Sequence, residues 1–329
     1  MSVVRVPRGN VVAFAIAAVV MAVLPWLFPS YVAFELAYAG AYAIAILGLI
    51  ILTGMNGQIS LGHGAFMAIG GYTVAIAVSR AGWPPEVAMV LAALLCALFG
   101  AVVGIVALRL SGAYLALATF ALAVSVAPIL KRFKETTGGT QGITLSTAHA
   151  PAVLASVIDS ERWLYYEAWL LVGVLFAATW FLLQGRLGRA LRALRDNEIA
   201  AVSFGINPSI YKSLAFAWSA AYAGIAGALI ASATAYVSPD SYALQLSITL
   251  LIGAVLGGLV SMWGAVAGGI VVEFLPLWAQ NINTAAASLI YGISLIVVMI
   301  LMPGGIIGAV RHVAHTIIRP RTEGKPERS

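Results

Sequence analysis

The fold is decided by the stretch Leu52-Thr-Gly-Met-Asn-Gly-Gln-Ile-Ser-Leu-Gly-His-Gly-Ala-Phe-Met-Ala-Ile-Gly-Gly-Tyr72. Six glycines interrupt it, and Asn56, Gln58, Ser60 and His63 bring polar groups into an otherwise apolar passage. Irregular backbone is tolerated at membrane depth only where protein or a water-filled cavity satisfies its polar groups. The stretch therefore predicts either a broken or re-entrant element inside a membrane protein, or a plain turn followed by a tightly packed helix.

The composition around this stretch excludes a soluble globule. Of the 329 residues, 62% are hydrophobic and only 9% are charged, whereas soluble domains carry about 25% charged residues. The net charge of +6 is scattered between long apolar runs and forms no basic patch with interleaved aromatics. We therefore expect the lipid bilayer as the solvent and no nucleic acid as a partner.

Apolar runs long enough to span a bilayer recur along the whole chain. A spanning helix needs about 20 mostly apolar residues. Ten candidate spans are residues 11–29, 34–53, 64–79, 87–108, 112–130, 165–184, 211–233, 243–260, 265–279 and 286–303. The third and ninth are short, so they either extend into their flanks or enter the membrane without crossing it. We expect an all-α, polytopic membrane helix bundle of eight to ten transmembrane helices, forming one domain over 11–310.

Lysine and arginine residues set the expected orientation, because in short loops they stay on the cytoplasmic side. Placing the N-terminal segment 1–10 inside puts most of them in the cytoplasm. Both termini are then cytoplasmic, 131–164 is a long outer loop and 185–210 a long inner loop. The polar, proline-interrupted tail 311–329 is expected to be disordered.

The inner loop contains a short amphipathic helix. Leu187, Leu191 and Leu194 recur at helical spacing, and arginines three residues apart cover the rest of the surface. Such a helix either lies on anionic headgroups or seats in a groove of a cytoplasmic partner. We favour the partner, because the polar residues 196–198 and a terminating Gly205 follow at once.

An acidic residue, Glu273, lies near the middle of the ninth candidate span. Carboxylates within a membrane are costly, so each is a functional candidate. Glu273 either lines a substrate pathway or has a structural partner in the bundle. With Gln58, Ser60 and His63, it forms our hypothetical set of pathway residues.

Motifs for catalysis are absent from the sequence. It contains no G-x-x-x-x-G-K-[ST] phosphate loop, no metal-ligand spacing and no recognisable nucleophile with a base and an acid. We therefore predict no catalytic residues, no metal site and no cofactor in this chain, and expect any ATP to be hydrolysed by partner subunits.

Several motifs, in order over residues 48 to 310, resemble the permeases of the branched-chain amino acid ABC importers. They are residues 52–63, Gly112-Ala-Tyr-Leu-Ala-Leu-Ala-Thr-Phe-Ala, Thr137-Gly-Gly-Thr-Gln-Gly-Ile143, Gly188-Arg-Ala-Leu-Arg-Ala-Leu-Arg-Asp-Asn-Glu-Ile-Ala-Ala201, Ser238-Pro-Asp, Gly257-Gly258 and Pro303-Gly-Gly-Ile-Ile-Gly308. The resemblance implies that the 188–205 loop meets an ATPase. The coupling residues so implied are Gly188, Arg189, Arg192, Arg195, Asp196, Glu198, Ala201 and Gly205.

The resemblance also implies the rest of the machine. The implied partners are a homologous second permease subunit, two cytoplasmic ATP-binding subunits and a periplasmic substrate-binding protein. The implied location of the chain is the bacterial inner membrane. The implied mechanism is alternating access driven by ATP on separate chains. Similar permeases serve urea, short amides or aromatic acids, so these substrates stay open. The rival class is an ion-coupled secondary transporter, which would recruit Glu273 and the glycine-rich stretch for ion coupling.

Overall fold

The structure of the protein is a computed structural model. It describes residues 21, 23–108, 110, 112–146, 158–282, 286–302 and 304–310. The predictions for the N-terminal segment 1–10, for most of the first span 11–29 and for the tail 311–329 lie outside these residues.

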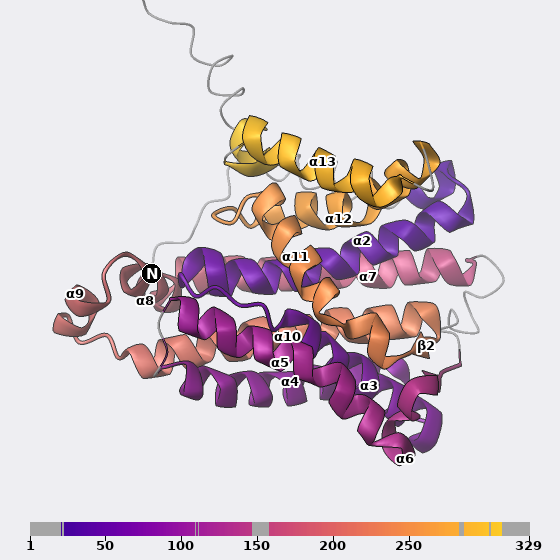
Figure 1. Cartoon of the computed structure of the whole chain (residues 1–329), viewed down its shortest axis with the longest axis horizontal. Coiled ribbons are helices and arrows are strands. Elements are labelled where there is room, and N and C mark those ends of the chain that lie inside the picture. Colours follow the sequence, from indigo (N-terminus) through magenta and orange to yellow (C-terminus); the bar gives the residue numbers. More distant parts are fainter. Residues whose placement is uncertain are drawn as a thin grey trace, which may run out of the picture.

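The described chain is a bundle of long helices with one two-residue strand pair (Figure 1). The helices and strands are α2 (Ser30–Leu49), the π-helical turn η1 (Ile50–Met55), α3 (His63–Ala81), α4 (Pro85–Ala107), α5 (Ala113–Arg132), α6 (Lys134–Thr137), the 3-10 turn η2 (Gly139–Gln141), β1 (Ile143–Thr144), α7 (Ser160–Gln184), α8 (Arg186–Asp196), α9 (Glu198–Ser203), α10 (Pro208–Thr234), β2 (Tyr236–Val237), the 3-10 turn η3 (Pro239–Tyr242), α11 (Leu244–Gly257), α12 (Trp263–Ile282) and α13 (Ala287–Leu301).

The fold class that the sequence predicts is confirmed. Among the described residues, eight helical segments are long and apolar enough to cross a membrane. The two spans that looked short are resolved by extension into their flanks, because α3 runs over His63–Ala81 and α12 over Trp263–Ile282. Each therefore reaches the length of about 20 residues that a bilayer requires.

Helix α2 lies at the centre of the bundle, packed against α7, α10 and α12. Its sequence is apolar on every side and rich in alanine, which suits a helix that is surrounded by other helices. Figure 1 shows α2 and α7 side by side, with α12 and α13 on one side of them. A second layer of α3 and α4 packs against α10.

Glycines let α3 and α10 approach closely. A Cβ added to Gly70 would lie 2.0 Å from the Gly224 carbonyl oxygen, and one added to Gly227 would lie 2.0 Å from that of Met67. Small residues at such crossings are the usual device of membrane helices, which gain no hydrophobic free energy from leaving lipid and depend on close packing. The α3–α10 contact is therefore fixed by backbone proximity.

The two ends of the bundle differ in construction. At the end that carries α8 and α9, the chain forms a protruding helical loop (Figure 1). At the opposite end, β1 pairs with β2 in antiparallel register, and Lys131 forms an ion pair with Asp240 at 2.6 Å. Arg80 donates to the Glu135 and Thr136 carbonyls there. The strand pair and the ion pair tie the predicted outer loop to the α10–α11 connection, and Arg80 ties it to the end of α3.

Candidate functional site: the helix break and the α8–α9 loop

The glycine-rich stretch forms a break between α2 and α3. Helix α2 ends in the π-helical turn η1, and residues 57–62 are not helical before α3 begins at His63. Single π turns are rare in proteins, and those that occur are often found at functional sites. Gly54 is required in this turn, because a Cβ there would lie 1.8 Å from the Leu259 carbonyl oxygen.

The break re-enters the bundle and does not turn at its surface. His63 bonds to Ser219, which lies about 16 Å along α10 from the first residue of that helix at 1.5 Å per residue. Ser219 in turn donates to the Gly48 carbonyl, which precedes the π turn in α2. Helix α3 therefore begins inside the bundle, as the prediction of a broken or re-entrant element required.

Side chains from three other helices hold the irregular backbone. The Leu61 amide donates to Thr119 Oγ1 of α5 at 3.0 Å, and the Gly64 amide donates to Ser247 Oγ of α11 at 2.9 Å. Ser219 Oγ of α10 donates to the Gly48 carbonyl at 2.7 Å. These bonds satisfy the backbone where the helical ladder is interrupted, which is the condition for such backbone at membrane depth.

His63 has one defined hydrogen-bonding role. Ser219 uses its single proton on Gly48, so at 2.7 Å the Nε2–H of His63 must donate to Ser219 Oγ. His63 Nδ1 is then a bare acceptor. Within the described residues, neither His63 Nδ1 nor Asn56 Oδ1 has a hydrogen-bond partner, and both side chains are buried. Buried polar atoms usually have a hydrogen-bond partner, either in the protein or in ordered water.

The predicted pathway residues do not form one cluster. Gln58, Ser60 and His63 are all buried in the break, where Gln58 accepts from Asn56 and Ser60 accepts from the Gly62 amide. Glu273 lies elsewhere, on α12, where its half-buried side chain is close enough to Glu35 of α2 to interact with it electrostatically. Its neighbour is therefore a second carboxyl group and not His63.

The predicted amphipathic helix of the loop is α8, and its leucine stripe faces the bundle. Leu191 and Leu194 are buried, and Leu191 packs in a cluster with Leu52 of η1 and Phe216 of α10. Gly188 permits the tight turn from α7, since a Cβ there would lie 2.0 Å from the Leu183 carbonyl oxygen. The apolar face of α8 is thus used within the chain.

Arg195 joins α8 to the break. Its guanidinium Nη1 donates to the Gly54 carbonyl at 2.8 Å, across 141 residues of sequence, and its side-chain stem packs on Gly57. Gly57 has a φ of +74° and no room for a Cβ, which would lie 2.9 Å from Arg195 Cγ. Helix α8 is therefore attached directly to the end of the π turn.

The acids at the end of α8 and the start of α9 are paired within the chain. Asp196 pairs with Arg195 at 3.0 Å, and Glu198 pairs with Lys212 of α10 at 2.7 Å. The loop then turns at Asn197, whose side chain accepts from the Ala200 amide and caps α9.

Three apolar side chains of this loop are exposed beside its charged ones, and the sequence patterns did not reveal them. Ile199 is 82% exposed and Phe204 is 87% exposed, with Val202 half exposed beside them. Ala201 is buried, and Gly205 ends the short helix with a φ of +79°. The signal in the sequence was the three large apolar residues at 199, 202 and 204, directly after a run of charged and polar residues. We call these three residues the α9 tip.

No three His, Cys, Asp or Glu residues among the described positions could hold a metal ion together. The described chain does join an exposed loop to a broken helix in the core, through the hydrogen bond of Arg195 to Gly54.

The fold and these two regions define a polytopic membrane protein with a buried helix break and a protruding loop fixed to it. Residues 31–301 match the family model described as "Branched-chain amino acid transport system / permease component". The chain therefore belongs to this family of transport permeases, as the sequence motifs predicted.

Curated relatives agree with this assignment. The chain is 33% identical over 291 residues to the high-affinity branched-chain amino acid transport system permease protein LivM of Salmonella typhimurium, covering 82% of this chain and 68% of that protein. It is 32% identical over 293 residues to LivM of Escherichia coli K12, with the same coverage. It is 25% identical over 284 residues to LivH of the same strain, covering 81% and 91%. No solved structure matches the chain significantly.

Proposed function

We propose that this chain is the membrane-spanning permease subunit of an ATP-driven importer for branched-chain or similarly apolar amino acids, with ATP hydrolysed on separate chains. The family supports the permease role, and two relatives are named for high-affinity branched-chain amino acid transport. The mechanism we propose is alternating access.

The observation that carries the proposal is the α9 tip. Large apolar side chains on a protruding polar loop mark a surface that a protein partner covers. Ile199 and Phe204 stand almost fully free of their own chain, whereas the neighbouring charges of Glu198 and Lys212 neutralise each other. A short helix with apolar anchors fits a hydrophobic groove, so we assign the tip to a groove of a cytoplasmic ATPase.

The route from the tip to the core supports coupling. Helix α9 follows α8 directly, and α8 is joined to the π turn by the Arg195–Gly54 hydrogen bond. When the ATPases close on ATP, the tip moves with them and α8 pulls on the break. The break then shifts the buried segment of Gln58, Ser60 and His63, and the cavity shared with a second permease changes the side to which it opens.

The remaining partners follow from the same assignment. The chain lies in the inner membrane beside a homologous second permease subunit, with both termini and the α8–α9 loop in the cytoplasm. A periplasmic binding protein delivers substrate at the opposite end, where β1, β2 and η3 lie. This end presents the surface that the Lys131–Asp240 ion pair and the strand pair hold together.

Reconstitution tests the proposal. Proteoliposomes are made with this chain and with the second permease and the ATPases encoded with it. They should import leucine when ATP is on the side of the membrane that carries the ATPases and the loaded binding protein is on the opposite side. Changing Ile199 and Phe204 to serine should lower ATP-driven uptake at least about tenfold. Unchanged uptake by that double variant would contradict the proposed docking.

The substrate is tested in the same vesicles. Leucine, isoleucine and valine should compete with one another for uptake, while urea, short amides and aromatic acids should not. If urea, an amide or an aromatic acid is the better competitor, the importer assignment stands and the substrate class changes.

A second candidate function rests on the pairing of Glu273 with Glu35. Two interacting carboxyl groups within spanning helices are the type of group that an ion-coupled secondary transporter uses. Vesicles that contain this chain alone distinguish the two functions. Uptake driven by a proton or sodium gradient without any ATPase would favour the secondary transporter.

A further inference from the structure

A polar face runs along η3 and the first turns of α11. Ser241 and Gln245 are exposed, and Thr249, one turn further on, is half-buried. Residues four apart lie on the same side of a helix, so Gln245 and Thr249 share one face of α11. Asp240, whose side chain is 70% exposed, continues this face toward the end of the bundle that carries β1 and β2.

Two buried side chains fix the orientation of this face. Tyr242 donates to the Gly227 carbonyl of α10 at 3.3 Å, and Ser247 accepts from an α3 amide at 2.9 Å. Both side chains turn toward the bundle, so Ser241 and Gln245 turn away from it. No hydrogen bond joins the Gln245 amide to the described part of the chain. Its donors and its acceptor are therefore available to another molecule.

The depth of Gln245 follows from its neighbour Ser247. Ser247 bonds to Gly64, the residue after His63, and His63 bonds to Ser219 of α10. Ser219 is about 16 Å from the start of α10 and about 22 Å from its end, at 1.5 Å per residue. The hydrocarbon core is about 30 Å thick, so a level this far from both ends lies inside it. Figure 1 shows α11 crossing the long helices midway along their length.

Helix α4 shows a different surface at the same depth. Gly100 of α4 packs against Ala220, the residue after Ser219. The exposed side chains beside it are Leu94 and Leu98, at 64% and 62%, and both are apolar, as contact with lipid requires. Lipid offers no hydrogen-bond partner to an amide, so polar side chains at this depth face the bundle interior or a water-filled cavity.

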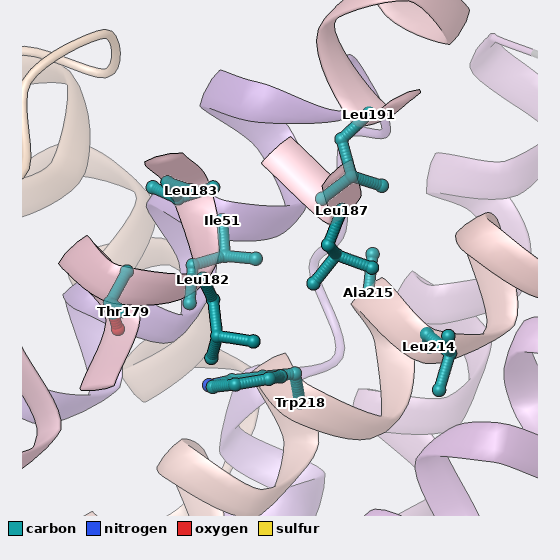
Figure 2. Close-up of a pocket in the computed structure, with 9 residues that line it drawn as sticks. All are labelled: Ile51, Thr179, Leu182, Leu183, Leu187, Leu191, Leu214, Ala215 and Trp218. Carbon is teal, nitrogen blue, oxygen red and sulfur yellow. The ribbon is translucent and has the colours of Figure 1, made fainter. Parts of the chain in front are cut away.

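The pocket under α8 is too small for an amino acid. Its lining side chains are aliphatic except for Thr179 and Trp218, as Figure 2 shows. Thr179 already bonds to the Leu175 carbonyl and to Tyr222. The accessible space is about 10 Å³, which is about the volume that one water molecule needs. The polar face of η3 and α11 is therefore the better place for a substrate.

We propose that this polar face lines the substrate pathway and that the Gln245 amide binds the charged groups of a passing amino acid. The inference rests on the proposed function and names a residue that contacts the substrate. The amide oxygen accepts from an ammonium group and the amide N–H groups donate to a carboxylate, so one side chain can hold either group of a zwitterion. The face continues to Ser241 and Asp240, as a water-filled route requires.

Thiol labelling tests whether the face is wet. Cys96 is the only cysteine of the chain, so Cys96→Ala gives a thiol-free background. In the assembled importer, Gln245→Cys should react with a membrane-impermeant cationic methanethiosulfonate. Leu98→Cys, at matched depth on α4, should react at least about tenfold more slowly, because a thiolate forms in water and not in lipid. Equal rates would overturn the proposal, since Gln245 would then face lipid or be covered by the second permease.

Leucine uptake tests the contact with substrate. Gln245→Leu keeps the size of the side chain and removes its hydrogen-bonding groups, so ATP-driven uptake should fall about tenfold. The matched control is Gln280→Leu, at an exposed position near the end of α12, which should leave uptake unchanged. Melting temperatures of both variants should equal that of the parent.

The parent importer separates the two possible failures. A parent that shows no ATP-driven uptake would count against the proposed function itself. An active parent with unchanged uptake by Gln245→Leu, or with equal losses at 245 and 280, would overturn only the present inference.

Discussion

The helix break and the α9 tip have opposite polarity patterns. In the break, polar side chains are buried and bond to the chain itself, as His63 does to Ser219. In the tip, apolar side chains are exposed, as Phe204 shows at 87%. A buried polar network fixes an internal shape, whereas an exposed apolar cluster implies a missing partner. The break therefore fixes the internal shape of the bundle, the tip offers a surface for a partner, and Arg195 links the two regions.

Substitution in the π turn should have the largest effect on stability. Gly54→Ala places a Cβ 1.8 Å from the Leu259 carbonyl oxygen, where backbone must move. We expect a loss of about 3 kcal/mol, visible as a lower melting temperature of the purified chain in detergent.

A matched glycine gives the control for that loss. Gly173 lies within α7, and a Cβ there would meet nothing within 4 Å. Gly173→Ala should be neutral or slightly stabilising, because alanine is the better helix former. Equal melting temperatures for the two variants would show that the break is not tightly packed.

Removing the histidine of the break should have the next largest effect. His63→Ala leaves the Ser219 hydroxyl without its donor in a buried site, and such losses cost about 1–3 kcal/mol. Thermal unfolding of His63→Ala, Ser219→Ala and the double variant forms a cycle. The two effects should not add, because the residues share one hydrogen bond. Additive effects would contradict a hydrogen bond between His63 and Ser219.

The cap of α9 should make a smaller contribution. Asn197→Ala removes the acceptor for the Ala200 amide, which costs about 1 kcal/mol in helix stability. Hydrogen exchange of the α9 amides should accelerate by about fivefold, whereas exchange in α3 should not change. Asn197→Asp keeps the acceptor and should behave like the parent chain. Acceleration in the aspartate variant would argue against capping.

The tip itself should affect stability least. Phe204→Ser alters a side chain that is 87% exposed, so the melting temperature should change by the equivalent of less than about 0.5 kcal/mol. Co-purification of the ATPases should nevertheless fall severalfold. A large drop in melting temperature would show that Phe204 packs on its own chain and would weaken the contrast between the two regions.

The sequence predicted the bundle well, because span length and hydrophobicity are local properties. It identified the break from its glycines, but it could not choose between a surface turn and a re-entrant element. That choice depends on the contact of His63 with Ser219, which is separated from it by 156 residues. The neighbour of Glu273 was equally beyond reach, since α2 and α12 are far apart in sequence.

The loop was predicted in outline, but its contacts were not. Its leucine periodicity correctly indicated a helix, and Gly205 correctly marked an end. The docking role predicted for Asp196 and Glu198 stays a prediction, and the structure adds their ion pairs with Arg195 and Lys212, which the sequence did not show. The α9 tip escaped notice because its helix spans six residues, too few for a periodic pattern to be recognised.

The most direct measurement is photo-crosslinking from the tip. Benzoylphenylalanine is placed at Phe204 in membranes that contain the chain with its ATPases, and in a second sample at Phe181, which is 74% exposed on α7. Position 204 should crosslink to an ATPase subunit, and position 181 should not. Absence of an ATPase adduct at 204, or equal adducts at both positions, would contradict the claim that the α9 tip docks to the ATPase.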